Sequence, residues 1–247
     1  MRDELRAAAA AFAFLTRVPL PRSLALTGDD VTRAAAWFPL VGAGLGCLTG
    51  VVAWACAQAL PTELAAALAV AALGLLTGAL HFDALADTAD AAGGTTRERA
   101  LEIMRDHAIG SYGALALVLD VVVRVTAIAF LVSHGNVVAD LAVAGAVSRA
   151  APVAVASVLP YARTSDGLGA SLTRGSARRA FIAGVLALAI AAAVGRVTGL
   201  EILAAGAIVT VLAGAVWRRW LGGVTGDTLG ATAELAELVG LVVAVAV

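Results

Sequence analysis

The sequence predicts an all-α fold, a polytopic membrane helix bundle of about seven transmembrane helices. Composition is the first reason, because 61% of the 247 residues are hydrophobic and only 14% are charged, whereas a soluble domain averages about 25% charged residues. The second reason is a series of apolar runs that are long enough, or nearly so, to cross a hydrocarbon core of about 30 Å. The third is the distribution of arginine, which alternates between the two ends of those runs.

The chain is expected to form one integral membrane domain over residues 1–247, without a soluble appendage. Residues 1–30 hold only a short apolar core at 5–15, which is followed by Arg17 and Pro19. Because that core is too short to span a bilayer, we expect an N-terminal helix that lies at the membrane interface.

Seven apolar runs follow this N-terminal segment and account for the expected bundle. Glycines recur in the first run and favour close packing of helices; they are Gly42, Gly44, Gly46 and Gly50. The runs predict membrane spans near 35–60, 64–82, 111–132, 137–159, 178–195, 200–217 and 228–247.

Arginine placement predicts the orientation of the bundle. Only Arg196 lies in one of the short connections at one end, and Arg124 and Arg149 lie inside runs. The other fourteen of the 17 arginines lie in the N-terminal segment and in the loops at 93–110, 160–180 and 218–227. Under the positive-inside rule the N-terminus and these long loops face the cytoplasm. We therefore expect a multi-pass protein of the cell membrane with its active site on the cytoplasmic face.

Net charge limits the partners that the chain can have. The formal charge is −1, so no basic field is available to bind nucleic acid. The expected partners are the lipid bilayer and a small-molecule substrate, and a homo-oligomer is possible.

The most informative segment is HFDALADTAD, residues 81–90, which places Asp83, Asp87 and Asp90 at i, i+4 and i+7. On a helix these three carboxylates fall within an arc of roughly 60°. Like charges on one face repel each other, and ionisable groups at a bilayer edge are rare and usually functional. A hard divalent cation offsets this repulsion, since carboxylate oxygens suit Mg²⁺ and Mn²⁺. We expect a metal site here; the alternative is a solvated acidic helix end.

Other polar residues near the predicted cytoplasmic loops extend this candidate site. Asp106 is a plausible fourth metal ligand, and Arg105 beside it suits a bidentate phosphate contact or a positive-inside anchor. His107 is either a substrate contact or an exposed interfacial histidine. His81 precedes the acids and either hydrogen-bonds an aspartate or packs in the core. Thr225 or Asp227 can cap the last helix, whose free N–H groups favour an anion.

Several ionisable residues lie inside the apolar runs. Asp120 and Arg124 are spaced i, i+4 and are most simply a mutual pair within one helix. Glu234 and Glu237 indicate a polar cavity wall, or partners for Arg149 or Arg124. The chain has no Gly-x-Ser-x-Gly, Walker A or GxGxxG motif, so acyl transfer and dinucleotide binding lack support.

Several segments together resemble the adenosylcobinamide-GDP ribazoletransferase (cobalamin synthase) family across nearly the whole chain. The most specific are GALHFDALADTADAAGG at 78–94 and TGDTLGATAELAEL at 225–238. The others, in family order, include FLTRVPLP at 14–21, WFPLVGAGLG at 37–46, RALEIMRDHAIGSYGALALVL at 99–119 and PYAR at 160–163.

The resemblance implies the final assembly step of cobalamin biosynthesis. Adenosylcobinamide-GDP is joined to α-ribazole or its 5′-phosphate, which gives adenosylcobalamin or its 5′-phosphate and releases GMP in an Mg²⁺-dependent phosphoryl-type transfer for which Mn²⁺ can substitute. By motif position it implies metal and catalytic roles for Asp83, Asp87, Asp90 and Asp106. It also makes Arg105, Arg163 and Asp227 candidates for substrate contact, beside His81, His107 and Thr225.

Two other functions stay open on the sequence. A CDP-alcohol phosphotransferase of lipid synthesis also uses clustered aspartates with Mg²⁺, although the arginine that its motif requires is missing from ADTADAA. An ion-coupled transporter would use a relay of intramembrane ionisable groups, namely Asp120, Arg124, Glu234 and Glu237.

Overall fold

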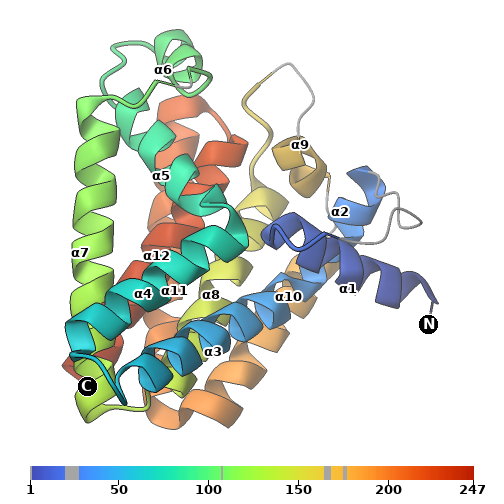
Figure 1. Ribbon diagram of the computed structural model, residues 1–247. Helices are drawn as coiled ribbons and strands as arrows, with labels where there is room; N and C mark the ends of the chain where they lie inside the picture. Colours follow the sequence, from blue (N-terminus) through green and yellow to red (C-terminus); the bar gives the residue numbers. More distant parts are fainter. Residues whose placement is uncertain (1, 20–27, 107, 164–167, 175–176) are drawn as a thin grey trace.

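The computed structural model is helical almost throughout, and its long helices pack side by side into a bundle (Figure 1). It describes residues 2–19, 28–106, 108–163, 168–174 and 177–247. Within these ranges the only β-type pairing is an isolated bridge between Tyr161 and Val224. The predicted all-α polytopic bundle is confirmed.

The described helices, in chain order, are α1 (Arg2–Leu15), α2 (Gly28–Ala34), η1 (Ala35–Trp37), α3 (Phe38–Cys56), α4 (Thr62–Thr77), α5 (Leu80–Ala91), α6 (Arg97–Ile103), α7 (Ser111–His134), α8 (Val137–Val158), α9 (Leu168–Thr173), α10 (Ala177–Ile190), η2 (Ala191–Gly195), α11 (Arg196–Leu221) and α12 (Gly226–Ala246).

Membrane-spanning helices make up most of the described chain. One bent pair, α4 with α5, adds a sixth candidate if it forms a single broken span. Five helical stretches are by themselves long and apolar enough to cross a bilayer: Thr32–Cys56, Ser111–His134, Val137–Val158, Ala177–Leu221 and Gly226–Ala246.

The 45-residue stretch Ala177–Leu221 reverses direction near its middle. Arg196 has a φ of 54°, and Gly199 lies so close to Ala191 that a Cβ at residue 199 would clash with the carbonyl of residue 191. Residues eight apart in a straight helix are separated by about 12 Å. The stretch is therefore a hairpin of two arms, as predicted for 178–195 and 200–217. The total of seven spans stays a prediction.

One predicted span is wrong in its extent. The sequence predicted a continuous helix over 64–82, but α4 ends at Thr77 and α5 leaves it at an angle of 91°. Gly78 and Ala79 both adopt left-handed backbone, with φ of 64° and 57°, and the Ala79 N–H donates to the carbonyl of Gly74 at 2.8 Å. Glycine reaches this conformation at little cost, so a helix readily ends there.

The break at Gly78 has a partner in the N-terminal segment. The Arg17 N–H donates to the Leu76 carbonyl at 2.7 Å, and the Arg17 side chain fills the space where a Cβ of residue 78 would stand. Preceding Arg17, α1 runs across the bundle and buries Ala10, Ala11 and Leu15 (Figure 1). The predicted N-terminal helix is thus present, and its place at the membrane interface stays a prediction.

The most extensive helix packing joins α3 to α8 through a seam of small residues. Gly42 meets the backbone of Gly145 and Gly46 meets that of Leu141, so that any side chain at either position would clash with backbone atoms. Gly50 meets Val138 in the same way, whereas a Cβ at Gly44 would lie in open space. Glycines spaced by four residues therefore let the two backbones touch, as in small-residue seams of membrane helices.

This seam predicts a large difference between neighbouring glycines of α3. Gly46→Val should lower the free energy of unfolding by about 3 kcal/mol or more, because the clash is with backbone and cannot be relieved by a rotamer change. The matched variant Gly44→Val should leave stability unchanged. Thermal unfolding of the purified protein in detergent measures both; equal melting temperatures would contradict the assigned seam.

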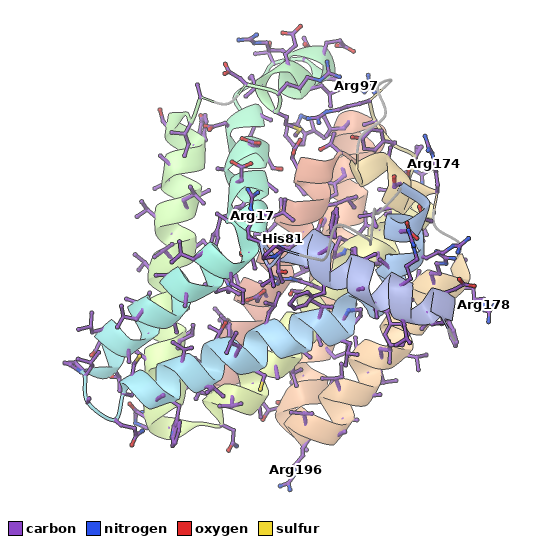
Figure 2. The ribbon with its side chains drawn as sticks, turned by 45° about the vertical axis from the view of Figure 1, so that its right-hand side comes forward. Arg17, His81, Arg97, Arg174, Arg178 and Arg196 are labelled. Atoms are coloured by element: carbon purple, nitrogen blue, oxygen red, sulfur yellow. The ribbon has the colours of Figure 1, made fainter. Side chains whose placement is uncertain are left out.

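The described arginines place the predicted cytoplasmic loops and the short connection at 196–199 at opposite ends of the molecule. Arg97 and Arg174 lie at one end of the molecule and Arg196 lies at the other (Figure 2). This matches the arrangement from which a cytoplasmic N-terminus was predicted.

Labelling of single cysteines tests the orientation in a background without Cys47 and Cys56. Arg99→Cys, at an exposed position on α6, should react only with a membrane-permeant thiol reagent in intact cells. Asn136→Cys, in the exposed turn between α7 and α8, should react with an impermeant one. Labelling of position 99 from outside would reverse the topology and move the candidate site to the opposite face.

Candidate active site

The aspartate helix α5 lies against the beginning of α12. The contact is close at Gly230, where an added Cβ would collide with the Ala84 side chain and approach the His81 ring within 3.6 Å. His81 and Ala84 are consequently buried, whereas Asp83 is exposed and Asp87 is half-buried one turn further along. The packing places the two most specific sequence motifs beside each other.

A cavity of about 170 Å³ lies at this junction. Its polar lining comes from three helices and consists of His81, Asp83, Arg149 and Asp227. The structure therefore brings together three of the predicted site residues. It adds Arg149 of α8, which the sequence indicated only as an ion-pair partner for an acid. Figure 2 shows His81 in the interior of the molecule.

Asp227 is held in place by two neighbours from the predicted site. Its carboxylate accepts a 2.6 Å charged hydrogen bond from Arg163 Nη2 and a 3.3 Å bond from the Thr225 hydroxyl. Thr225 also forms a capping box with Thr228 at the start of α12, which confirms it as the helix cap. Because Thr225 is fully buried, its hydroxyl holds the Asp227 carboxylate from the interior of the protein.

Asp90 has a structural role that the sequence did not reveal. One of its carboxylate oxygens accepts the N–H of Gly110 at 2.7 Å and the other accepts that of Gly113 at 2.8 Å. These N–H groups belong to the first turn of α7, where a carboxylate satisfies free donors and favours the helix dipole. Asp90 thus fixes the start of α7 against the end of α5.

The remaining predicted residues lie after α6. Asp106 is exposed and accepts the N–H of Ala108 at 3.1 Å within its own turn, and Arg105 beside it is also exposed. His107 lies outside the described residues. Among the described residues, no three of histidine, cysteine, aspartate and glutamate lie close enough to hold a metal ion. The predicted four-aspartate ligand set is not gathered in this structure, and the metal stays a prediction.

A buried network of charges lies next to the cavity and links α7, α8 and α12. Arg124 pairs with Asp120 at 3.0 Å, with Glu237 at 2.6 Å and also with Glu234. Glu237 in turn binds Arg149, whose Nη1 also donates to the Ser148 hydroxyl. The predicted Asp120–Arg124 pair and the alternative of arginine partners for Glu234 and Glu237 are both confirmed. All four residues of the hypothetical transport relay are held in these ion pairs.

Comparison with known proteins assigns the chain to a family. The family described as Cobalamin-5-phosphate synthase matches residues 7–245. The chain belongs to this family. The resemblance predicted from the motifs is confirmed, and the alternatives of lipid synthesis and ion transport gain no support.

Relatives that share this membership cover almost the full chain. Proteins named adenosylcobinamide-GDP ribazoletransferase match it in Leptothrix cholodnii, with 42% identity over 92% of this chain and 90% of the relative, and in Bradyrhizobium diazoefficiens, with 41% identity over 98% and 93%. A third, from Escherichia coli, is 36% identical over 93% of this chain and 95% of the relative. No solved structure gives a significant match.

The buried network predicts that Arg124 is needed for stability. Arg124→Met leaves Asp120 and Glu234 without their cation, and breaking such a buried pair costs about 3 kcal/mol or more. For a chain of this size that corresponds to a fall of roughly 10 °C in Tm. The matched control is Arg99→Met, which removes an exposed pair with Glu102 and should change Tm little. A Tm for Arg124→Met equal to that of the control would show that the network does not stabilise the bundle.

Proposed function

We propose that this chain joins adenosylcobinamide-GDP to α-ribazole, or to its 5′-phosphate, and releases GMP in the final assembly step of cobalamin biosynthesis. The observation that carries the proposal is the near full-length match to relatives named for this reaction. The cavity between α5 and α12 supports it, since it joins the two most specific family motifs into one polar site.

The reaction replaces the phosphoanhydride bond of a pyrophosphate with a new phosphate ester bond. A ribose hydroxyl of α-ribazole attacks the phosphorus that carries cobinamide, the bond from that phosphorus to the bridging oxygen breaks, and GMP leaves with the bridging oxygen. The hydroxyl proton must pass to a base. Asp83 and Asp227 line the cavity on opposing helices, and either carboxylate suits this role.

Two arginines supply positive charge at the cavity, since Arg149 lines it and Arg163 pairs with Asp227, which also lines it. Arg163 is engaged with Asp227, and a guanidinium also binds phosphate in a bidentate manner. We infer that the pyrophosphate competes with Asp227 for Arg163 as it binds. That exchange would release the Asp227 carboxylate for the reaction.

The carboxylates of the cavity also fit the predicted Mg²⁺. This ion is commonly held by one or two carboxylates together with substrate phosphates and water, without a complete protein cage. Asp83 and Asp227 would hold it, and Asp87 lies one turn after Asp83 on α5. When bound, the ion would neutralise charge on the pyrophosphate, and Mn²⁺ should substitute because oxygen ligands suit both ions.

The site is proposed to face the cytoplasm. Asp83 is exposed, and the positive-inside rule places the arginine-rich connections that hold Arg97 and Arg174, seen at one end in Figure 2, on the cytoplasmic side.

The proposal predicts that Asp83 carries catalysis. Asp83→Asn keeps the size of the side chain but removes its charge, so the protein should fold normally and lose at least about 10²-fold in GMP release, the effect of removing one positioned electrostatic group. Asp87→Asn should raise the Mg²⁺ concentration that is needed for half-maximal rate. The measurement is GMP release from adenosylcobinamide-GDP and α-ribazole by the purified protein, with and without chelator.

Glu98→Gln is the control, since Glu98 is an exposed acid of α6 and its loss should leave the rate unchanged. A parent protein that releases no GMP would overturn the proposed function. Near-parent activity of Asp83→Asn would instead leave the function in place and remove Asp83 from the catalytic group, and full activity in excess chelator would remove the metal.

A further inference from the structure

The cavity beside Asp83 has a mostly apolar wall that the transfer of a phosphoryl group does not require. Phe14 of α1 and Phe38 of α3 line it, and their rings are stacked with centroids 5.4 Å apart. Leu172 of α9 and Leu229 of α12 also line it. A charged pyrophosphate gains nothing from such surroundings, whereas a flat aromatic ring does.

Two buried polar groups line the same cavity without hydrogen-bond partners. Within the described part of the chain, Nδ1 of His81 and Nε of Arg149 have none, although the two residues are only 7% and 2% exposed. An unsatisfied buried donor or acceptor costs about 1–3 kcal/mol. A ligand that offers one or two polar ring atoms would offset this cost.

The volume of the cavity limits which part of the two substrates it can hold. The cavity of about 170 Å³ is comparable to a cavity of about 150 Å³ that holds one benzene molecule in another protein, so it suits a small ring system and is far too small for a corrin macrocycle. Guanine presents several donors and acceptors along its edge, more than His81 and Arg149 can pair. A benzimidazole presents only one free ring nitrogen and an otherwise apolar body.

We propose that this cavity binds the benzimidazole base of the acceptor nucleoside α-ribazole. The base lies against Phe14 and Phe38, its free ring nitrogen meets His81 or Arg149, and the ribose projects toward Asp83 and Asp227. This inference rests on the proposed function, and it assigns the cavity to the acceptor and leaves the GDP portion to the exposed side of the aspartates.

Gly226 offers a way to narrow the cavity without disturbing the fold. It lines the cavity, and a Cβ built there meets no heavy atom within 4 Å. Gly226→Leu should raise KM for α-ribazole by roughly tenfold or more, since overfilling a packed site costs about 1–3 kcal/mol. KM for adenosylcobinamide-GDP should change less than about twofold. The smaller Gly226→Ala should give an intermediate effect and guards against a loss of folding.

Gly184→Leu is the matched control, because Gly184 is exposed on α10 and its Cβ also lies in open space; it should leave both KM values unchanged. A rise in KM for adenosylcobinamide-GDP alone in Gly226→Leu would overturn the assignment of the cavity to the acceptor.

A binding measurement separates this inference from the proposed function. Equilibrium dialysis of free benzimidazole against the purified protein, without metal or second substrate, should show binding that weakens roughly tenfold in Gly226→Leu and also weakens in His81→Phe. Adenine should bind less tightly than benzimidazole. Equal binding of benzimidazole by parent and Gly226→Leu would refute the inference even if GMP release is intact. Absence of GMP release would refute the function even if benzimidazole binds.

Discussion

The fold depends most on the pairing of charges that are buried among its helices. Arg124 on α7 contacts acids on its own helix and on α12, and Glu237 carries the connection to Arg149 on α8. No water is available inside a bilayer to solvate an unpaired ion, so these groups are compatible with the membrane only when the three helices stand in one register. Apolar packing alone tolerates sliding of one helix past another, whereas ion pairs of fixed length do not. The network therefore sets the positions of α7, α8 and α12 along their axes relative to one another.

The break between α4 and α5 at Gly78 and Ala79 then places the aspartates of α5 against these helices. With a straight helix over 64–82, the acidic segment would have continued along the axis of α4. The turn of 91° instead lays α5 against α12, where His81 and Asp83 meet Asp227 across the cavity. Asp90 secures the other end of α5 by binding the first turn of α7. The acidic face is thus fixed at both ends by contacts that its own sequence does not contain.

Local spacing explains which of these features the sequence could predict. The apolar runs predicted the helices because burial in lipid requires a continuous apolar segment, and the i, i+4 spacing of Asp120 and Arg124 predicted their pair. The sequence did not predict the break between α4 and α5, because Gly78 and Ala79 are themselves apolar and glycine is common inside membrane helices. Asp90 was predicted as a ligand because a carboxylate that caps another helix looks, in sequence, like any third acid of a cluster. That Asp83 and Asp227 line one cavity depends on how α5 packs on α12, and no local pattern encodes that. The family motifs marked both segments as important without indicating that they touch.

The acidic side chains become more exposed from the buried ion-pair network toward the cavity. This difference explains why only the acids at the cavity are available for chemistry. Asp120 and Glu234 are 1% and 3% exposed and are held by Arg124, so they have neither access to water nor a free position for a ligand. Asp83 is exposed, and the cavity beside it joins both environments. A pyrophosphate carries several charges and cannot enter the buried region without losing hydration that the paired ions there could not replace. An apolar base loses little by entering it. Arg149 belongs to both regions, since Glu237 holds it from the network while its side chain lines the cavity. The ion pairs that stabilise the bundle therefore also deliver a fixed positive charge to the place where the charged and apolar parts of the substrates must meet.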